Sequence, residues 1–237
     1  TETGSQDKCQ ILEEDFHIRM TQTLESEVSI MCNLSKGVEE KGIEKGRQEG
    51  KRKCCRKMPM SNIKLISAEK ESEEKIMFFR KSFIEAGEST INGSRGLHHF
   101  EHYDEWVQKV KECAMPENDI LGVQTTLYMA MRRTDEKIIG CIELRHTLNE
   151  DLKVLGGHVG FSVVPEERKK GYATEMLSQV IEKARGLGIP AILLTCDTEN
   201  AASKKTIIKC GGVLEKVRSI QCHGEEKRCE YYWISLC

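Results

Sequence analysis

One continuous stretch, from Gly156 to Cys196, constrains the fold most, because it reads as a strand, a basic turn, a helix and a second strand. Apolar residues over about 158–164 predict the first strand. A continuous apolar run at 191–196 predicts the second, and Gly188 with the following Ile-Pro ends the intervening pattern. Between them, apolar residues at helical spacing predict an amphipathic helix over about 171–187. This unit requires a fold that mixes helices with strands.

The turn that opens this helix is unusually basic. It reads Arg168-Lys169-Lys170-Gly171-Tyr172-Ala173. The first turn of a helix leaves about four backbone N–H groups without partners, and the helix dipole makes that end positive. Cations are unfavourable there unless an anion offsets them, so the pattern favours an anion site over a plain helix start. Gly171 and Ala173 keep the backbone accessible, as a pyrophosphate site requires.

The rest of the chain after residue 60 predicts further short strands and helices in mixed order, hence an α+β fold. An antiparallel meander becomes parallel where the helix crosses over. In the strand over 137–145, alternation places Ile139, Cys141, Glu143 and Arg145 on one face. The expected strands lie at about 63–67, 125–132, 137–145, 158–164, 191–196, 213–221 and 228–234, and the expected helices at about 71–86, 104–113, 171–187 and 201–209.

The basic turn resembles the Arg/Gln-x-x-Gly-x-Gly/Ala motif of the GNAT acyltransferase superfamily. The order of elements over about 61–237 is similar too, and the segments Gly156–Phe161 and Ile139–His146 resemble a bacterial branch of GNAT acetyltransferases. The resemblance implies a mixed, mostly antiparallel twisted sheet flanked by helices, with acetyl-CoA as the acyl donor and no metal. A homodimer is left open.

The resemblance also implies which residues bind the cofactor. Backbone groups of the strand would pair with the pantetheine arm, the N–H groups of the basic turn would hold the pyrophosphate, and an N–H near Val163 or Val164 would face the thioester oxygen. Asn200 matches a family asparagine that contacts the cofactor, although a plain N-cap is an equal interpretation. The implied cofactor-binding residues are Phe161, Ser162, Val163, Val164, Arg168, Lys169, Lys170, Gly171, Tyr172, Ala173, Asn200 and Ser203.

Candidates for acid–base chemistry are fewer. An ammonium group must lose a proton before it attacks, which calls for a carboxylate, a histidine or water. Glu143, acidic among apolar neighbours in mid-strand, is the candidate base, with a surface ion pair as the alternative. His146 and His158 lie at strand ends and could relay the proton or bind substrate, or could be ordinary hydrogen-bonded histidines.

The proton donor to the leaving thiolate departs from the family pattern. Many members carry a tyrosine seven residues after the asparagine, and here that position is Ile207. Ser203 or water could protonate coenzyme A, or the thiolate could leave unaided, since its pKa is near ~8.5. Tyr231 and Tyr232 are candidate substitutes, although aromatic residues in a last strand are usually core.

Residues 1–57 are expected to form a separate helical and basic extension or linker. Glycines recur about every fourth residue over 37–50, and residues 36–57 hold nine Lys or Arg against four Glu. This favours a solvated helix or linker, with contact to nucleic acid or a partner as the alternative. The first 50 residues resemble the C-terminal tail of the recombination-promoting nuclease/transposase family, but none of the acidic residues that a nuclease needs is present. Thr1 in place of Met is consistent with a fragment or a processed chain.

Two clusters could be mistaken for metal sites. His98 and His102 are one helical turn apart, but nothing nearby completes a ligand set, so a loop lining the acceptor cleft is favoured. Cys222 and His223 with Cys229 flank a hairpin-like turn, and no metal is assigned there either. The 11 cysteines are odd in number and lack a Cys-x-x-Cys, which favours reduced thiols.

Composition sets the remaining limits. Lys plus Arg number 36 against 38 Asp plus Glu, so a globally basic nucleic-acid binder is excluded. No apolar run approaches the ~20 residues that cross a bilayer, and no signal-peptide core is present. We therefore expect a cytoplasmic N-acyltransferase that moves an acetyl group from acetyl-CoA to a small-molecule amine in a ternary complex. The alternatives are an acyl-CoA-binding sensor without turnover and a peptide or protein N-acetyltransferase.

Overall fold

The computed structural model describes residues 61–68, 72–118, 122–222 and 225–236. The predicted extension over 1–57, with its basic segment and its resemblance to nuclease/transposase tails, lies outside these residues. The strands are β1 (Ile63–Ser67), β2 (Thr125–Arg132), β3 (Ile138–Arg145), β4 (Val159–Val163), β5 (Ala191–Asp197), β6 (Val213–Cys222) and β7 (Glu225–Ser235). The helices are α3 (Glu73–Glu85), α4 (Tyr103–Glu112), α5 (Glu150–Val154), α6 (Tyr172–Gly186) and α7 (Ala201–Lys209), with short 3₁₀ turns at Leu97–His99, Pro116–Asn118 and Pro165–Glu167.

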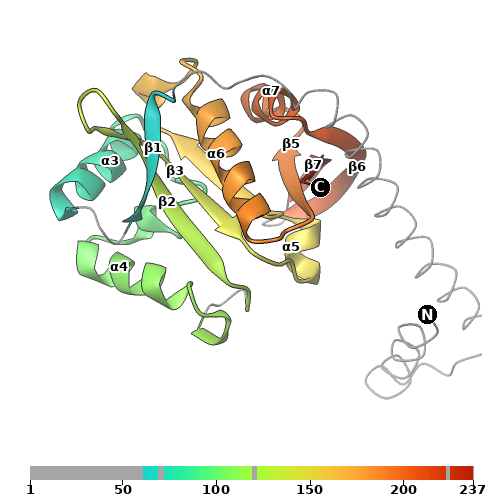
Figure 1. Cartoon of the computed structure of the whole chain (residues 1–237), viewed down its shortest axis with the longest axis horizontal. Helices are drawn as coiled ribbons and strands as arrows, with labels where there is room; N and C mark the ends of the chain where they lie inside the picture. Colours follow the sequence, from blue (N-terminus) through green and yellow to red (C-terminus); the bar gives the residue numbers. More distant parts are fainter. Residues whose placement is uncertain (1–60, 69–71, 119–121, 223–224, 237) are drawn as a thin grey trace, which may run out of the picture. The chain divides into compact units, whose positions relative to one another are not determined.

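Helices cover both faces of a four-stranded antiparallel sheet of order β1-β2-β3-β4. One face packs against α6, where Ile142 and Leu144 join Met176 and Leu177 in a buried cluster. The other face packs against α3 and α4, where Met129 and Cys141 join Phe79, Phe83 and Trp106. Figure 1 shows α3 and α4 on one side of these strands and α6 on the other. The prediction of an α+β fold with a mostly antiparallel sheet is therefore confirmed.

A bulge in β3 changes one predicted face. Ala130 pairs with Gly140, whereas Met131 pairs with Ile138, so Ile139 is an extra residue between them. Ile139 consequently packs in the α6 cluster, and not on the face of Cys141 where simple alternation placed it. Beyond the bulge the alternation holds, and Glu143 and Arg145 keep the predicted face.

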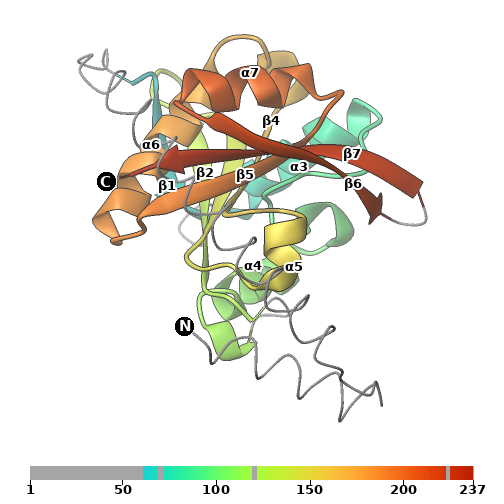
Figure 2. The same ribbon diagram turned by 90° about the vertical axis from the view of Figure 1, so that its right-hand side faces the viewer.

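A second, three-stranded sheet of order β5-β7-β6 follows α6. Figure 2 shows α7 on one side of this sheet and α5 on the other. The two sheets meet beside His158, whose N–H donates to the carbonyl of Leu193 at 2.8 Å, and the N–H of Gly156 donates to Thr195 Oγ1 at 3.1 Å nearby. A Cβ on Gly157 would lie 2.4 Å from that carbonyl oxygen, so the close approach requires glycine. The predicted parallel pairing of β4 with β5 is thus replaced by a junction between two antiparallel sheets.

Most predicted boundaries agree with the structure within two residues, and the differences have local causes. Helix α3 begins after Ser72, whose hydroxyl accepts from the N–H of Lys75. Helix α5 was not predicted. It is only five residues long, and Asn149 caps it by accepting from the N–H of Leu152 at 2.9 Å. A helix this short has too little apolar periodicity to be seen in the sequence.

Two further features concern compartment and membranes. In the part of the chain that the structure describes, Cys113, Cys141, Cys196, Cys210 and Cys229 form no disulfide bond. Burial raises the pKa of the Cys141 thiol well above its usual range, so this group is an inert part of the core. Among the described residues, no helix is both long and apolar enough to cross a membrane.

Candidate active site

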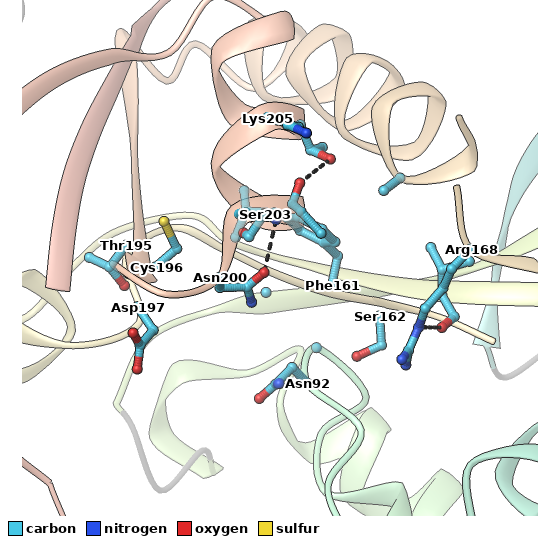
Figure 3. Close-up of a pocket in the computed structure, with 18 of the residues that line it drawn as sticks. Asn92, Phe161, Ser162, Arg168, Thr195, Cys196, Asp197, Asn200, Ser203 and Lys205 are labelled. Atoms are coloured by element: carbon cyan, nitrogen blue, oxygen red, sulfur yellow. Dashed lines mark hydrogen bonds between the residues drawn. The ribbon is translucent and has the colours of Figure 1, made fainter. Parts of the chain in front are cut away.

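A groove of about 1230 Å³ opens beside β4, on the edge that faces the second sheet. Its walls come from β4, the turn into α6, the end of β5 and the first turns of α7 (Figure 3). Most of the residues predicted to bind a cofactor line it: Phe161, Ser162, Val163, Arg168, Lys169, Gly171, Tyr172, Ala173, Asn200 and Ser203. Of the described residues in that prediction, Val164 and Lys170 do not line it.

The turn end of the groove, residues 168–173, is built mainly from backbone. Gly171 is the N-cap of α6 with φ 91°, and Lys169 has φ 63°. Nothing lies within 4 Å of where a Cβ on Gly171 would stand, so its left-handed conformation, and not crowding, requires glycine. The carbonyl of Gly171 accepts from the N–H groups of Thr174 and Glu175, which leaves the N–H groups before them without helical partners. Unpartnered N–H groups at the start of a 15-residue helix are suited to binding an anion.

The three cations of this turn are not equivalent. Lys170 donates to Glu167 at 2.8 Å, and Arg168 pairs with Glu88. Burial by itself would raise the pKa of Glu167, but Lys170 and Arg132 together hold that pKa below its usual value. Lys169 is exposed and has no ion-pair partner among the residues that the structure describes. Only Lys169 therefore has its full charge directed to solvent or to a ligand.

The edge of β4 offers backbone groups to the groove. Alternate N–H groups of a strand point to opposite edges, and the N–H of Val164 donates to Ile139 at 2.9 Å. Val163 consequently points its N–H and carbonyl toward the open edge, and its carbonyl accepts from Arg168 Nε at 3.0 Å. Of the two expected donors to a thioester oxygen, Val163 is the one whose N–H faces the groove.

The start of α7 forms the opposite wall. Asn200 is the N-cap, and its side-chain oxygen accepts from the N–H of Ser203 at 3.0 Å (Figure 3). Asn200 thus makes the predicted cap while also lining the groove. Lys205 and Lys209, one turn apart on α7, line the groove as well, although the sequence analysis did not select them. Their i, i+4 spacing on a helix capped by a selected asparagine was the available signal.

Comparison with known proteins agrees with this architecture. Residues 83–213, more than half of the chain, match the family model described as Acetyltransferase (GNAT) domain. The chain belongs to the GNAT acetyltransferase family. It is 26% identical over 117 residues to the uncharacterized N-acetyltransferase YoaA of Bacillus subtilis. That alignment covers 49% of this chain and 63% of YoaA, so the chain spans less than two thirds of that relative.

Solved structures share the GNAT fold at low sequence identity. The microcin C7 self-immunity acetyltransferase MccE, in complex with acetyl-CoA and AMP, matches with a TM-score of 0.54 and 17% identity over 74% of this chain and 93% of that chain. A chimera of the spermidine N-acetyltransferase SpeG from Vibrio cholerae and hSSAT matches with a TM-score of 0.51 and 16% identity, covering 74% of this chain and 96% of that chain. At these identities the likeness supports the fold alone.

Beyond the turn end of the GNAT groove lies a carboxylate end, made of Glu143, Arg145 and Gly160. Glu143 is 4% exposed and pairs through Oε1 with Arg145, while its Oε2 lies 3.6 Å from Arg95 Nη1. Within the described part of the chain, Oε2 accepts no hydrogen bond. Arg145 also donates to the carbonyl of Gly157 at 2.9 Å, so this pair holds the segment that joins the two sheets. Glu143 lines the groove, as a base must, but it is also part of a buried charge cluster.

The two candidate histidines are placed differently from Glu143. His146 hydrogen-bonds to Thr126 at 2.9 Å, and His158 Nδ1 accepts from the N–H of Leu193 at 2.9 Å. Burial lowers the pKa of His158 to about 4, and the charge of Arg145 acts in the same direction. Burial also lowers the pKa of His146. Among the described groove-lining residues, neither histidine is present.

The tyrosines near the end of the chain do not face the groove within the described structure. Tyr231 donates to the carbonyl of Val154 at 2.5 Å, and Tyr232 donates to Glu230. Burial, followed by the neighbouring Glu230, raises the pKa of Tyr232 well above its usual range. Ile207 is fully buried, in close contact with Gly212. Of the side chains predicted as proton donors to the thiolate, Ser203, Tyr231 and Tyr232, Ser203 is therefore the one that lines the groove.

In the loop before α4, His98 makes contacts that hold the loop together. His98 Nδ1 accepts from the N–H of Ile91 at 3.3 Å, and its ring lies 4.0 Å from that of His99, centroid to centroid. Burial, together with His99 and Arg80, lowers the pKa of His98. No group of three or more potential ligands is placed to hold a metal within the described ranges.

One wall of the groove was not predicted from the sequence. Residues 88–93, here called the bridging segment, connect α3 to the loop before α4, and Glu88, Thr90, Asn92 and Gly93 line the groove. Figure 3 shows Asn92 across the groove from Asn200. A Cβ on Gly93 would lie 2.2 Å from the carbonyl oxygen of Gly160, so this segment packs directly on β4. No local pattern marks this contact, because it joins residues far apart in the chain.

Proposed function

We propose that this chain transfers an acetyl group from acetyl-CoA to an amine by direct attack within a ternary complex. The observation that carries the proposal is the convergence of three sets of backbone groups on one groove: the open edge of β4, the start of α6 and the start of α7. A diphosphate linked to an extended amide-containing arm is complementary to this arrangement. The complex of MccE with acetyl-CoA, which has the same fold, supports this choice of donor.

In this proposal the turn end binds the diphosphate and β4 binds the arm. N–H groups from Lys169 to Ala173 receive the diphosphate, and Phe161 and Val163 pair with the arm as an added strand would. Asn200 contacts the arm from the other wall. The N–H of Val163 donates to the oxygen that becomes negative when the thioester carbonyl is attacked, which lowers the barrier.

The chemical step forms one bond and breaks another. The amine nitrogen bonds to the carbonyl carbon, the carbon–sulfur bond breaks, and the sulfur leaves with the electron pair. Glu143, directly or through a water, accepts the proton that the ammonium group must lose. The nitrogen loses a second proton as the amide forms, and this proton reaches the thiolate through Ser203 or water, or passes to solvent where the thiolate leaves unaided. His146 and His158 do not line the groove within the described structure. They serve as hydrogen-bonding residues of the sheets.

The acceptor is a small amine in this proposal, with a peptide N-terminus or lysine as the second choice. SpeG, which has the same fold, is named for spermidine, and this favours a small-molecule acceptor. The free thiols and the need for acetyl-CoA favour a cytoplasmic location.

The second candidate function is an acyl-CoA-binding module without turnover. The specific observation in its favour is that Ile207 and both C-terminal tyrosines are buried away from the groove within the described structure. Release of coenzyme A from acetyl-CoA, measured with a panel of spermidine, free amino acids and short peptides, separates the two functions. Turnover with any member supports the transferase. Calorimetric binding of CoA without release under every acceptor supports the module, and no CoA binding at all overturns both.

A further inference from the structure

The side chain of Arg168 is directed at the protein and not along the turn that it opens. Its Nη1 and Nη2 donate to the two oxygens of Glu88 at 2.6 and 2.8 Å, and its Nε donates to the carbonyl of Val163 at 3.0 Å. The guanidinium also lies over the ring of Phe83, 5.9 Å from its centroid. Such a fork-to-fork pair fixes direction as well as distance, which a lysine could not do.

Both partners of Arg168 are themselves held in place. Glu88 follows the end of α3, where Gly87 has φ 77° and donates to Ile84, and the N–H of Glu88 donates to Phe83 at 3.0 Å. These two bonds form a Schellman motif, so the backbone of Glu88 is fixed to α3. Val163 belongs to β4, and its own N–H is the group proposed to face the thioester oxygen.

The bridging segment is therefore fastened at both ends, and between them Ile91 donates its N–H to His98 Nδ1 at 3.3 Å. Glu88 is tied to Arg168 at one end, and Gly93 packs on Gly160 of β4 at the other. Between these points Thr90 and Asn92 line the groove. Movement of either fastening would change the width of the groove along β4.

We infer that Arg168 is a positioning residue that holds the bridging segment against the edge of β4, and that it is not a direct ligand of the cofactor diphosphate. The inference rests on the proposed function of the groove and assigns a role that the motif alone does not give. The side chains of Arg168 and Glu88 are 43% and 32% exposed, and an ion pair this accessible adds little to overall stability. Its effect is on geometry: it keeps a fixed separation between the bridging segment and β4, the two walls between which the amine would reach the thioester in the proposed function.

Five variants test this role: Arg168→Gln, Arg168→Lys, Glu88→Gln, the Arg168→Gln/Glu88→Gln double variant, and the control Glu85→Gln. Glu85 ends α3 three residues before Glu88 and pairs with exposed Lys81, so its substitution changes charge equally without touching the groove. Three quantities are measured for each: the Kd for CoA by calorimetry, amide exchange over residues 88–93 without CoA, and the KM for the best amine of the acceptor panel. The Arg168→Lys variant keeps the positive charge but cannot donate to both oxygens of Glu88 as the guanidinium does.

Under the inferred role, Arg168→Gln, Arg168→Lys and Glu88→Gln each speed exchange over 88–93 by about fivefold, whereas the control does not. The Arg168→Gln/Glu88→Gln double variant exchanges no faster than either single one, because both remove the same contact. The KM for the amine rises about threefold or more, while the Kd for CoA stays within about twofold.

The opposite pattern overturns the inference. If Arg168→Gln weakens CoA about tenfold or more while Arg168→Lys and Glu88→Gln do not, Arg168 acts as a charge on the diphosphate. Unchanged exchange in Glu88→Gln overturns it as well, even if the Arg168 variants fail to fold. Absence of CoA binding by the unmodified chain would count against the proposed function, whereas the exchange measurement would still decide whether Arg168 holds the segment.

Discussion

The two ends of the groove present different chemical groups. At the turn end, residues 168–173, the groups directed to a ligand are backbone N–H groups exposed by the start of a helix. At the carboxylate end, Glu143 and Arg145 are buried side chains that pair with each other, and Arg145 also donates to the carbonyls of Gly156 and Gly157. Substitution at Gly171, which moves the backbone of the turn, should therefore change ligand affinity, whereas substitution at the carboxylate end should change stability.

The largest effect is expected for Glu143→Gln. Removing one partner of a buried ion pair leaves the guanidinium of Arg145 without its countercharge, which costs about 3–5 kcal/mol of unfolding free energy. Denaturant unfolding measures this cost, with Glu112→Gln as the matched control. Glu112 pairs with Lys109 on the surface of α4, and its substitution should cost less than about 1 kcal/mol. If both variants lose the same small amount of unfolding free energy, the carboxylate end is not a buried charge cluster.

The second effect concerns the junction of the sheets and depends on pH. The pKa of His158 is about 4 in the folded chain, against about 6.5 in an unfolded one, because burial, and then the charge of Arg145, disfavours the protonated ring. The unfolded chain binds the extra proton between these values, so stability is complete above about pH 6.5 and falls as pH approaches 4. The loss reaches at most about 3 kcal/mol.

A His158→Asn variant isolates this contribution. The asparagine side-chain oxygen can accept from Leu193 in place of Nδ1, but it does not titrate in this range. Unfolding measured from pH 7 to 4.5 should show a shallower decline for the variant than for the unmodified chain. Identical slopes would show that titration of His158 does not contribute to the pH dependence of stability.

The third effect is on affinity at the turn end. Gly171→Val forces φ 91° on a branched residue, which strains the backbone by about 1–2 kcal/mol and rotates the N–H groups that follow. We expect CoA affinity to fall at least about tenfold. Gly188→Val is a matched control, because Gly188 has φ 74°, lies just after the same helix and has no neighbour within 4 Å of an added Cβ. Equal loss of CoA affinity in both variants would show that helix strain, and not the turn, is responsible.

The same contrast explains what the sequence could predict. Helix starts and strand edges depend on local residues, so Gly171, Asn200 and the strand over 159–163 could be located from pattern alone. Arg168 could be selected as a cation but not given its partner, because Glu88 lies 80 residues away along the chain. Glu143 was visible as a carboxylate in mid-strand, but the sequence carries no signal that Arg145 spans the junction or that Arg95 approaches from a distant loop. Side-chain sites made by tertiary contacts require the structure.

The smallest effect is expected for the lysines of α7. Lys205 and Lys209 line the groove one turn apart, and the same segment of the wall begins with Asn200. An exposed charge near a phosphate contributes little and is screened by salt, so Lys205→Gln or Lys209→Gln should weaken CoA only about threefold at low ionic strength. Lys183→Gln is the control, because Lys183 lies on α6 over the ring of Tyr128 and does not line the groove within the described residues. If raising salt to 0.5 M leaves the difference between the α7 variants and the control unchanged, these lysines do not act on CoA through their charge.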